Sequence, residues 1–325
     1  MNYSAPVWLP NGNLQTIWAP LFARRFQTLK PRFKRERWAT PDHDFIDVDY
    51  LCLDSAVKQT KRLVVMFHGL EGSSESHYCE SFADHAKRHG YAIAVVHFRG
   101  CSGELNLAPR AYHSGDYEEI AWVLQRLKDE HKVPIVAVGV SLGGNALLRW
   151  AEEMGRAAAS IAEAVVAVCS PIDLAAGGRA IGVGFNKMVY TRRFLASMKP
   201  KALKKLEQFP GLFDLDAVMQ AQDLHAFDNA FTAPLHGFKN AEDYWARCSA
   251  KPHLHRIKIP ALVINAKNDP FIPASCLPRP HEVGQWVRLW QPKEGGHVGF
   301  TSGAYPGHLE ALPRNVMQWV ACVRS

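Results

Sequence analysis

Between residues 62 and 168, short and almost wholly apolar runs alternate with longer segments that have helical spacing. The segments between the runs repeat apolar residues at intervals of three and four, as amphipathic helices do. Strands separated by such helices pair in parallel, and strands that are apolar throughout must be covered on both faces. The pattern predicts an α/β fold with a mostly parallel sheet between two layers of helices. The predicted strands here are RLVVMF, YAIAVVHF, VPIVAVGV and EAVVAVCS.

Local signals place the ends of two helices in this region. The segment SESHYCESFADHAKRH is followed by Gly90, a common helix stop, so we expect a helix that ends there. Asp116 is followed three residues later by Glu119, and this spacing predicts a capping box at the start of the next helix.

The flanking segments extend the sheet. FKRERWAT and FIDVDYLCL predict an antiparallel pair joined by a turn at Pro41-Asp42, which would form the outer edge. After the central region, IPALVIN and QWVRLW predict two further strands, and a last helix is expected from about His308 to Val323.

The strand rhythm disappears after Ile172 and returns only after about Ser249. We interpret residues 175–250 as a mostly helical insertion that forms a cap or lid. The chain is expected to be a single domain over residues 1–325, with this lid inserted between the sixth and seventh core strands.

Composition favours a cytoplasmic protein. Lys and Arg number 38 against 31 Asp and Glu, and this formal net charge of +7 is no nucleic-acid signature, although it favours anionic partners weakly. No apolar run approaches the ~18 residues of a membrane span, and the N-terminus lacks the order of a signal peptide. The seven scattered cysteines show no C-x-x-C spacing, which indicates reduced thiols.

The pentapeptide Gly139-Val140-Ser141-Leu142-Gly143 lies between a predicted strand and a predicted helix. A sharp strand-to-helix turn holds such a serine in strained backbone angles, and small neighbours leave room for the turn. The hydroxyl is thereby held above the sheet, where a nucleophile is needed. The alternative is a glycine-rich turn without chemistry.

A serine hydroxyl needs a base, and the base needs an orienting carboxylate. Asp269 follows the predicted strand IPALVIN, and His297 follows QWVRLW, so both loops leave the sheet at the same end as Ser141. The order serine, acid, histidine is the one expected on such a sheet. Ser141, Asp269 and His297 are the predicted triad, with Asp173 as the reserve acid. An ordinary turn and an ordinary loop histidine are the alternatives.

The reaction also needs donors for an oxyanion. The backbone amide of Leu142, directly after the serine, is one candidate. The other is the amide of Leu70, in the His68–Gly72 segment that follows RLVVMF. His68 itself is expected to be structural, and a simple strand-ending turn is the alternative for this loop.

Six motifs, in order, resemble the YheT-like branch of the α/β-hydrolase superfamily, the relatives of plant embryogenesis-associated proteins and animal abhydrolase-domain lipases. The resemblance implies an α/β-hydrolase fold, and it places Ser141, Asp269 and His297 on the family's nucleophile, acid and base. The motifs are WLPNGNLQTIW (8–18), GLEGSSES (69–76), FRGCSG (98–103), GVSLGGN (139–145), NAKNDPFIP (265–273) and GGHVGF (295–300).

Two positions depart from the family's pattern. Asn13 stands where relatives commonly have histidine, and His97 stands where asparagine is common. Animal and plant relatives can carry a membrane anchor or a transit segment. The present sequence resembles the soluble bacterial type more closely.

Other signals carry less weight. His85 with His89, and His253 with His255, have spacings that metal ligands use, but neither pair has an evident third ligand. Basic residues cluster near the N-terminus and in the insertion, and we interpret them as solvated faces. The alternative is attraction to an acidic substrate or to anionic lipid, with weak peripheral contact with a membrane.

The sequence therefore predicts a serine hydrolase that cleaves carboxylic esters through an acyl-enzyme, a carboxylesterase acting on a small-molecule ester or lipid. It calls for no metal and no organic cofactor. The alternatives are a membrane-surface lipase or phospholipase, and a hydrolase-shaped binding protein without turnover. The acyl chain, the alcohol, the lid conformation and the oligomeric state are not predicted.

Overall fold

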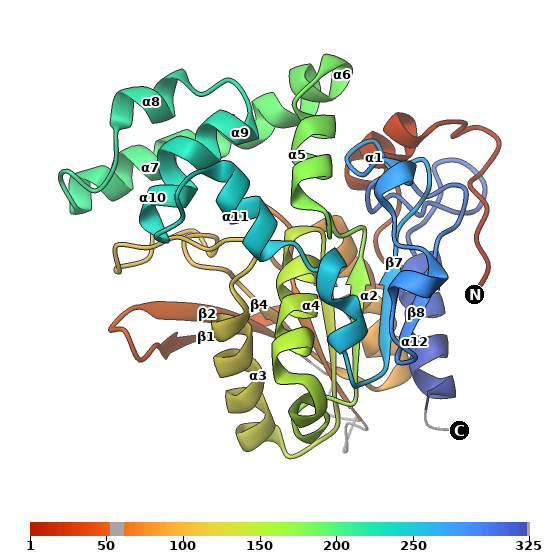
Figure 1. The fold of residues 1–325 in the computed structure, drawn as a ribbon. Helices are drawn as coiled ribbons and strands as arrows, with labels where there is room; N and C mark the ends of the chain where they lie inside the picture. The colour runs from red at the N-terminus through yellow and green to blue at the C-terminus, as the bar shows by residue number, and fades with distance from the viewer. Residues whose placement is uncertain (53–61, 324–325) are drawn as a thin grey trace.

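A single eight-stranded sheet organises the computed structural model, which describes residues 1–52 and 62–323 (Figure 1). The strand order is β1-β2-β4-β3-β5-β6-β7-β8, and all neighbours from β4 to β8 run parallel. The predicted α/β fold with a mostly parallel sheet is confirmed. The strands are β1 Phe33–Ala39, β2 Phe45–Leu51, β3 Leu63–Phe67, β4 Ala92–Val96, β5 Ile135–Val140, β6 Ala164–Val168, β7 Ala261–Ile264 and β8 Val287–Trp290.

The outer edge is the predicted antiparallel pair. In β1 and β2, Arg35 lies opposite Asp49 and Arg37 lies opposite Asp47. Both cross-strand pairs form ion pairs, at 2.7 and 2.8 Å. Such pairs fix the register of a charged edge. The predicted second strand extended to Leu53, which lies outside the described residues.

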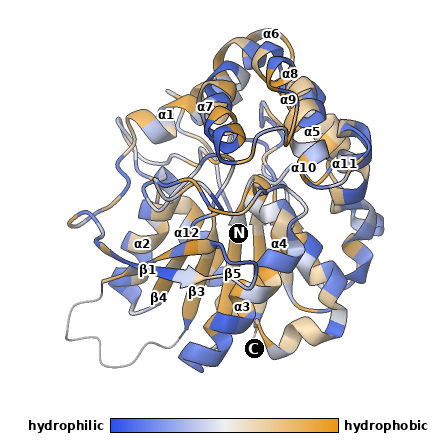
Figure 2. Ribbon diagram, turned by 90° about the vertical axis from the view of Figure 1, so that its left-hand side faces the viewer, coloured by the Kyte–Doolittle hydropathy of each residue, from blue (hydrophilic) through white to orange (hydrophobic). Residues whose placement is uncertain are grey.

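Helices cover both faces of the sheet. α3 (Tyr117–His131) and α4 (Leu142–Met154) pack on one face, and α2 (His77–His89) and α12 (Ala311–Cys322) pack on the other. Figure 2 shows the apolar strands enclosed between these helices. Successive residues of β3 point to opposite faces, so apolar side chains are needed at every position.

The ends of the helices follow the sequence only partly. α2 ends directly before Gly90, as predicted, and Gly90 adopts a left-handed φ of 71°. The predicted capping box of α3 is wrong, because arginines bind both carboxylates. Asp116 pairs with Arg110, and Glu119 pairs with Arg99. α12 begins at Ala311, later than predicted, because the backbone of His308 pairs with that of Ser302.

The segment between β6 and β7 consists mainly of helices at the carboxyl end of the sheet, where Figure 1 draws them as a separate group. These helices have small apolar clusters of their own. They are α5 Leu174–Ile181, α6 Gly184–Asn186, α7 Arg192–Gln208, α8 Leu215–Gln220, α9 Leu224–Phe227, α10 Ala233–Leu235 and α11 Ala241–Cys248.

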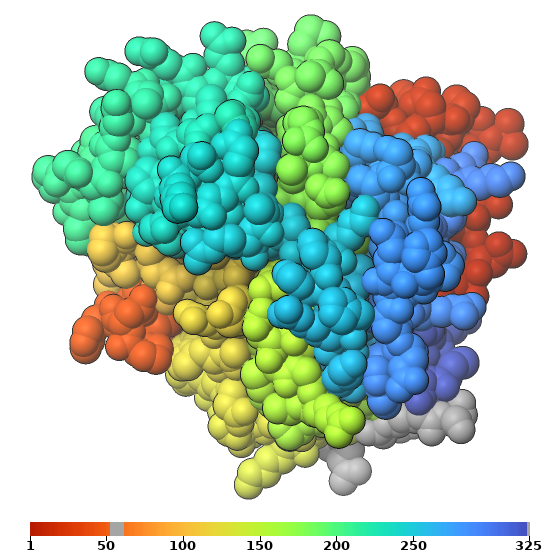
Figure 3. All heavy atoms as spheres, viewed as in Figure 1, coloured from red at the N-terminus to blue at the C-terminus, as the bar shows by residue number. Residues whose placement is uncertain are grey.

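An additional short helix, α1 (Gly12–Leu21), lies near the start of the chain. Asn11 caps its start, because the side chain accepts a hydrogen bond from the Leu14 amide at 3.0 Å. Figure 3 shows this N-terminal segment, in red, beside the blue loops of the C-terminal region. The first residues of the chain therefore lie next to the loops that follow the last strands.

Candidate active site

Ser141 lies in the turn that joins β5 to α4. Its φ of 52° and ψ of −120° form a combination that residues with a side chain rarely adopt. A Cβ atom at Gly139 would lie 2.5 Å from the carbonyl oxygen of Gly143, and one at Gly143 would overlap the carbonyl of His68. Only glycine fits at both positions, so the glycines that flank the serine allow the strained turn.

Two loops bring Asp269 and His297 to Ser141. β5, β6, β7 and β8 are adjacent and parallel, so their carboxyl ends meet at one edge. Nε2 of His297 lies 3.0 Å from Oγ of Ser141, and Nδ1 lies 2.9 Å from Oδ2 of Asp269. The Asp269 side chain is inaccessible, whereas that of His297 keeps 10% exposure. The structure thus joins the three predicted residues in one hydrogen-bonded chain.

The protons in this chain can be assigned from its partners. An ionised carboxylate only accepts, so Nδ1 of His297 carries a proton and donates it to Asp269. Nε2 is then free to accept from the Ser141 hydroxyl. The other carboxylate oxygen of Asp269 accepts from the Phe271 amide at 2.8 Å, and the Phe271 ring stacks on the imidazole at 4.0 Å. The geometry is suited to removing a proton from the serine.

The amides of Leu70 and Leu142 lie beside the serine. Leu142 is the first residue of α4, where a helix leaves its amides without intrahelical partners. Within the described part of the chain, neither amide has an acceptor among the backbone hydrogen bonds. Both residues line the cavity that contains Ser141 and His297. Two unpaired amides in such a position can bind developing negative charge.

Two tyrosines fix the loop that carries Leu70. The Tyr78 hydroxyl accepts from the Gly69 amide at 2.9 Å, and the Tyr112 hydroxyl accepts from the Glu71 amide at 2.9 Å. Glu71 adopts a left-handed φ of 57°, so the turn needs this support. Leu70 lies between these two anchored residues, so the position of its amide is fixed as well.

His68 is neutral and structural. Its Nε2 accepts from the Phe98 amide at 3.0 Å, and its Nδ1 lies 2.7 Å from the carbonyl oxygen of Gly69. Complete burial lowers the pKa of His68 to about 3. A neutral ring can serve both bonds, one as acceptor and one as donor, in agreement with its predicted structural role.

Helix α1 supports the loops of the acid and the base, which the sequence reasoning missed. Oγ1 of Thr16 accepts from the His297 amide at 2.8 Å. Oε1 of Gln15 accepts from the Gly295 amide at 2.8 Å and from the side chain of Asn268 at 3.0 Å. Both residues lie in the WLPNGNLQTIW motif, whose presence was the one sign in the sequence that this segment matters.

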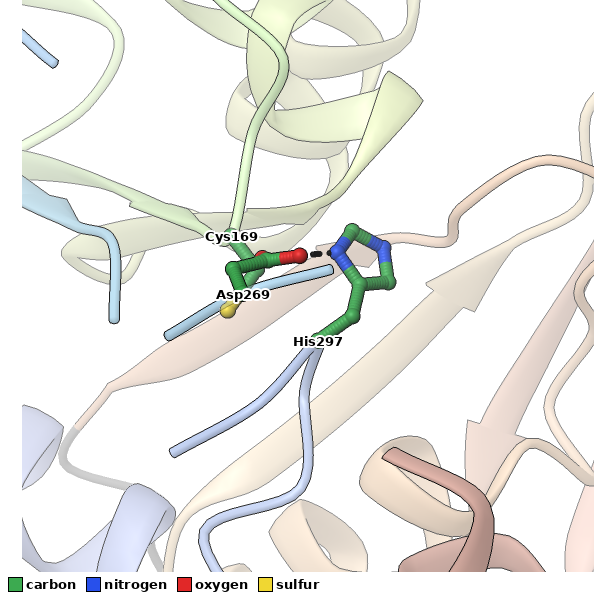
Figure 4. Close-up of side chains that lie close together, drawn as sticks. All are labelled: Cys169, Asp269 and His297. Carbon is green, nitrogen blue, oxygen red and sulfur yellow. Dashed lines mark hydrogen bonds and ion pairs between the residues drawn. The ribbon is translucent and has the colours of Figure 1, made fainter. Parts of the chain in front are cut away.

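Cys169, Asp269 and His297 lie close together (Figure 4). Their possible ligand atoms lie within 4.8 Å of one another, and they form the one such group among residues 1–52 and 62–323. Burial raises the pKa of the Cys169 thiol well above its ordinary value, whereas metals bind the thiolate. The sulfur instead contacts the Gly296 carbonyl and accepts from the Val298 amide. We assign Cys169 to the support of the histidine loop.

The reserve acid does not reach the histidine. Asp173 precedes α5, and its carboxylate accepts from the Ala176 amide at 3.0 Å. The prediction of Asp173 as a substitute acid is therefore wrong, because the residue caps a helix.

The two histidine pairs with metal-ligand spacing do not belong to the group of possible metal ligands found among the described residues. The rings of His85 and His89 stack at 4.1 Å, and Nδ1 of His89 bonds to the carbonyl of His85. His253 and His255 lie in one short 3₁₀ turn.

Neither departure from the family pattern contacts the triad. The Asn13 side chain accepts from the Tyr190 hydroxyl at 2.8 Å, which links α1 to the lid segment. Nε2 of His97 lies 2.8 Å from Asp49, which also binds Arg35. Both residues have structural partners of their own.

Comparison with known proteins gives the class first. Residues 62–304 match the family model described as the alpha/beta hydrolase fold. The esterase Pf2001 of Pyrococcus furiosus has a similar structure, with a TM-score of 0.53 and 17% identity over 92% of this chain and 95% of that one. The chain belongs to the α/β-hydrolase family, as its sheet and turn geometry indicate.

Sequence relatives narrow the assignment to a branch. YheT of Escherichia coli strain K12, a proposed esterase, is 38% identical over 95% of this chain and 90% of its own length. Human phospholipase ABHD3 is 27% identical over 98% of this chain and 78% of its own length. Embryogenesis-associated protein EMB8 of Picea glauca is 26% identical over 91% of this chain. These relatives confirm the predicted resemblance to the YheT-like branch.

In the part of the chain that the structure describes, no helix has both the length and the apolar character needed to span a bilayer.

Proposed function

We propose that this α/β hydrolase cleaves carboxylic esters with Ser141 as nucleophile, His297 as general base and Asp269 as orienting acid. The observation that carries the proposal is the hydrogen-bonded chain from Asp269 through His297 to Ser141, whose serine faces a cavity. The similarity to YheT and to esterase structures favours the same reaction class.

In this mechanism His297 takes the Ser141 proton while Oγ attacks the ester carbonyl. The amides of Leu70 and Leu142 bind the oxyanion, and the imidazolium then gives its proton to the departing alcohol. Water, activated by the same histidine, releases the acyl group. Asp269 keeps the imidazole in the required tautomer and stabilises its charged form. The route needs neither a metal nor an organic cofactor.

A panel of p-nitrophenyl esters with graded acyl chains tests this function. We expect the wild type to hydrolyse them and Ser141→Ala to lose essentially all turnover with almost unchanged thermal stability. A folded wild type that hydrolyses no ester would contradict the proposal and would favour the binding protein without turnover. A large loss of stability in the alanine variant would instead indicate a structural role for the serine.

The size of the cavity favours short substrates in this conformation. The space next to Ser141 is about 160 Å³. Apolar side chains of the lid segment, including Phe194 and Met198 of α7, line it. A short acyl chain fits such a space. We therefore expect the highest turnover with the short members of the panel.

Action as a lipase or phospholipase at a membrane surface is the second candidate, and the tip of the lid favours it. Val183, Phe185 and Met188 are 64%, 47% and 68% exposed. Arg192 and Arg193 follow in α7, and both are exposed. Apolar side chains next to cations suit the interface of an anionic bilayer.

Vesicle sedimentation separates this candidate from the first. If it is correct, the protein binds phosphatidylglycerol vesicles, and the double variant Phe185→Asp/Met188→Asp loses that binding. Trp286→Asp, at an exposed tryptophan at the other end of β8, is the control and should bind as the wild type does. No binding, or equal binding by all three proteins, would exclude a membrane role for the tip.

The remaining predictions complete the proposal. We propose one domain over residues 1–325 with residues 175–250 as its lid. A small-molecule ester or lipid is the proposed partner. The cytoplasm is the proposed location, in keeping with the scattered cysteines, which show no C-x-x-C spacing.

A further inference from the structure

One carboxylate on the cavity wall has no role in the mechanism above. Asp228 begins a π-helical turn, Asp228–Thr232, in the lid segment. It lines the same cavity as Ser141 and His297, and the residue is half-buried. π-helical turns are rare, and they occur frequently at functional sites. Asp228 is therefore placed where a bound substrate would meet it.

The hydrogen-bond partners of Asp228 are both neutral. One carboxylate oxygen accepts from the Thr232 hydroxyl at 2.7 Å, and the other accepts from the indole N–H of Trp245 at 2.8 Å. These bonds fix the orientation of the carboxylate, and neither partner carries a charge. His225, the basic residue nearest in sequence, is bonded to Glu242 instead.

The charge of Asp228 is present near neutral pH. Burial raises the pKa of Asp228 to about 6, so the group is ionised at pH 7.5. An ionised carboxylate that is removed from water without a cation is unfavourable. A cationic ligand that reached it would lower that free energy.

The walls around Asp228 are aromatic. Phe227, Phe231, Tyr244 and Trp245 line the same cavity. The rings of Phe227 and Phe231 lie 5.1 Å apart. Trp245 combines both features, because its N–H holds the carboxylate while its ring forms part of the wall. Aromatic faces beside a carboxylate are the chemistry that recognises ammonium groups.

The other charged residues on the cavity already have partners. Lys201 pairs with Glu71 at 2.7 Å. The ammonium of Lys205 is buried and donates to two backbone carbonyls. Arg99 binds three carboxylates, those of Asp42, Asp44 and Glu119. Among the described cavity residues, Asp228 is thus the carboxylate that has no basic partner in the ion pairs of the structure.

We propose that Asp228 and the aromatic residues around it form a subsite for a positively charged ammonium group on the substrate. The preferred ester then carries an amine or quaternary ammonium on its alcohol side or its acyl side. This inference rests on the proposed esterase function and specifies its substrate class.

The test compares esters that differ only in charge, at pH 7.5. Choline butyrate is paired with 3,3-dimethylbutyl butyrate, which places the charge on the alcohol side. The p-nitrophenyl esters of 4-(trimethylammonio)butanoate and 5,5-dimethylhexanoate place it on the acyl side. In one of the two pairs we expect the wild type to prefer the cationic member by about tenfold in kcat/KM. Asp228→Asn, which keeps the shape and removes the charge, should reduce that ratio to about one.

Thr232→Val is the matched control, because it removes a hydrogen bond to Asp228 and keeps the carboxylate. We expect it to retain the cationic preference. The inference is overturned if the wild type hydrolyses both members of each pair equally well. It is also overturned if the preference survives in Asp228→Asn. A wild type that fails on all four esters and on p-nitrophenyl butyrate would refute the esterase function itself.

Discussion

The histidine of the proposed triad is held by a residue that lies far away in the sequence. The His297 amide is bound by Thr16, 281 positions earlier, at 2.8 Å. The same Thr16 hydroxyl donates to the Gly12 carbonyl, which leaves it one defined orientation. The imidazole is therefore positioned from its backbone as well as through Asp269.

Thr16→Val should remove this support while keeping the side-chain shape. The buried His297 amide then lacks an acceptor, which costs about 1–3 kcal/mol of unfolding free energy. We expect kcat for p-nitrophenyl butyrate to fall about tenfold through misplacement of the imidazole. Steady-state kinetics and urea unfolding measure the two effects, and Thr16→Ser should restore both. Wild-type kcat in the valine variant would show that Thr16 does not position the base.

At the scale of residues, the sequence was sufficient to predict which chemically distinctive side chains lie together. Ser141, Asp269 and His297 each follow a recognisable strand, and parallel strands bring their carboxyl ends together. The contributions of Thr16, Gln15 and Cys169 could not be predicted, because they depend on side-chain contacts between distant segments. Asp173 shows the opposite error, since an acid after a strand is equally suited to cap the next helix.

At the scale of elements, α7 connects the lid segment to the turn that carries Leu70. Lys201 of α7 pairs with Glu71 at 2.7 Å, and Glu71 also accepts from the Tyr112 hydroxyl at 2.9 Å. Because Glu71 follows Leu70 directly, the position of α7 affects the proposed oxyanion donor. The helices between β6 and β7 and the turn with the proposed oxyanion donor are thereby linked.

Lys201→Met should weaken this coupling. The pair is partly exposed, so the unfolding free energy should change by no more than about 1 kcal/mol. We expect kcat to fall several-fold and amide exchange in residues 69–72 to accelerate, as measured by kinetics and hydrogen exchange. Lys201→Arg, which can keep the pair, should recover most of the activity. Unchanged exchange in the methionine variant would show that α7 does not hold the turn.

Elements whose apolar residues recur at regular intervals were predicted well, and elements that depend on tertiary contacts were not. The strands were recognisable because both faces of the sheet are buried. The capping box of α3 failed because Arg110 and Arg99 compete for the carboxylates. The helices between β6 and β7 show no such regular apolar pattern in the sequence, because their apolar residues face small separate clusters.

At the scale of the whole molecule, buried ionisable groups link stability to pH. Burial lowers the pKa of five histidines to about 4 or below, so they remain neutral in the folded protein above that pH, while the unfolded chain takes up protons below about pH 6.5. Burial raises the pKa of three carboxyls, which act in the opposite direction. The histidines are His68, His113 and His236, with pKa values of about 3, and His77 and His85, of about 4. The carboxyls are Asp228 and Glu152, of about 6 and 8, and Glu119, whose pKa burial raises in spite of its pairing with Arg99.

The histidines outnumber the carboxyls, so the unfolded chain binds more protons than the folded one between about pH 6 and pH 4.5. The unfolding free energy should therefore fall as the pH falls, by about 1.4 kcal/mol per pH unit for each excess proton. Urea unfolding at pH 6, 5.5 and 5 measures this dependence. A flat or rising free energy towards acid would contradict the neutral state of these histidines.

Covalent labelling tests the central claim, that Ser141 is activated by His297 and Asp269. A fluorophosphonate probe reacts with a serine only when a base and an oxyanion site assist it. Intact mass and peptide analysis of the wild type should show one adduct, at Ser141, while Ser141→Ala shows none and His297→Gln reacts far more slowly. A folded wild type that takes up no label, or that is labelled at another residue, would contradict the account.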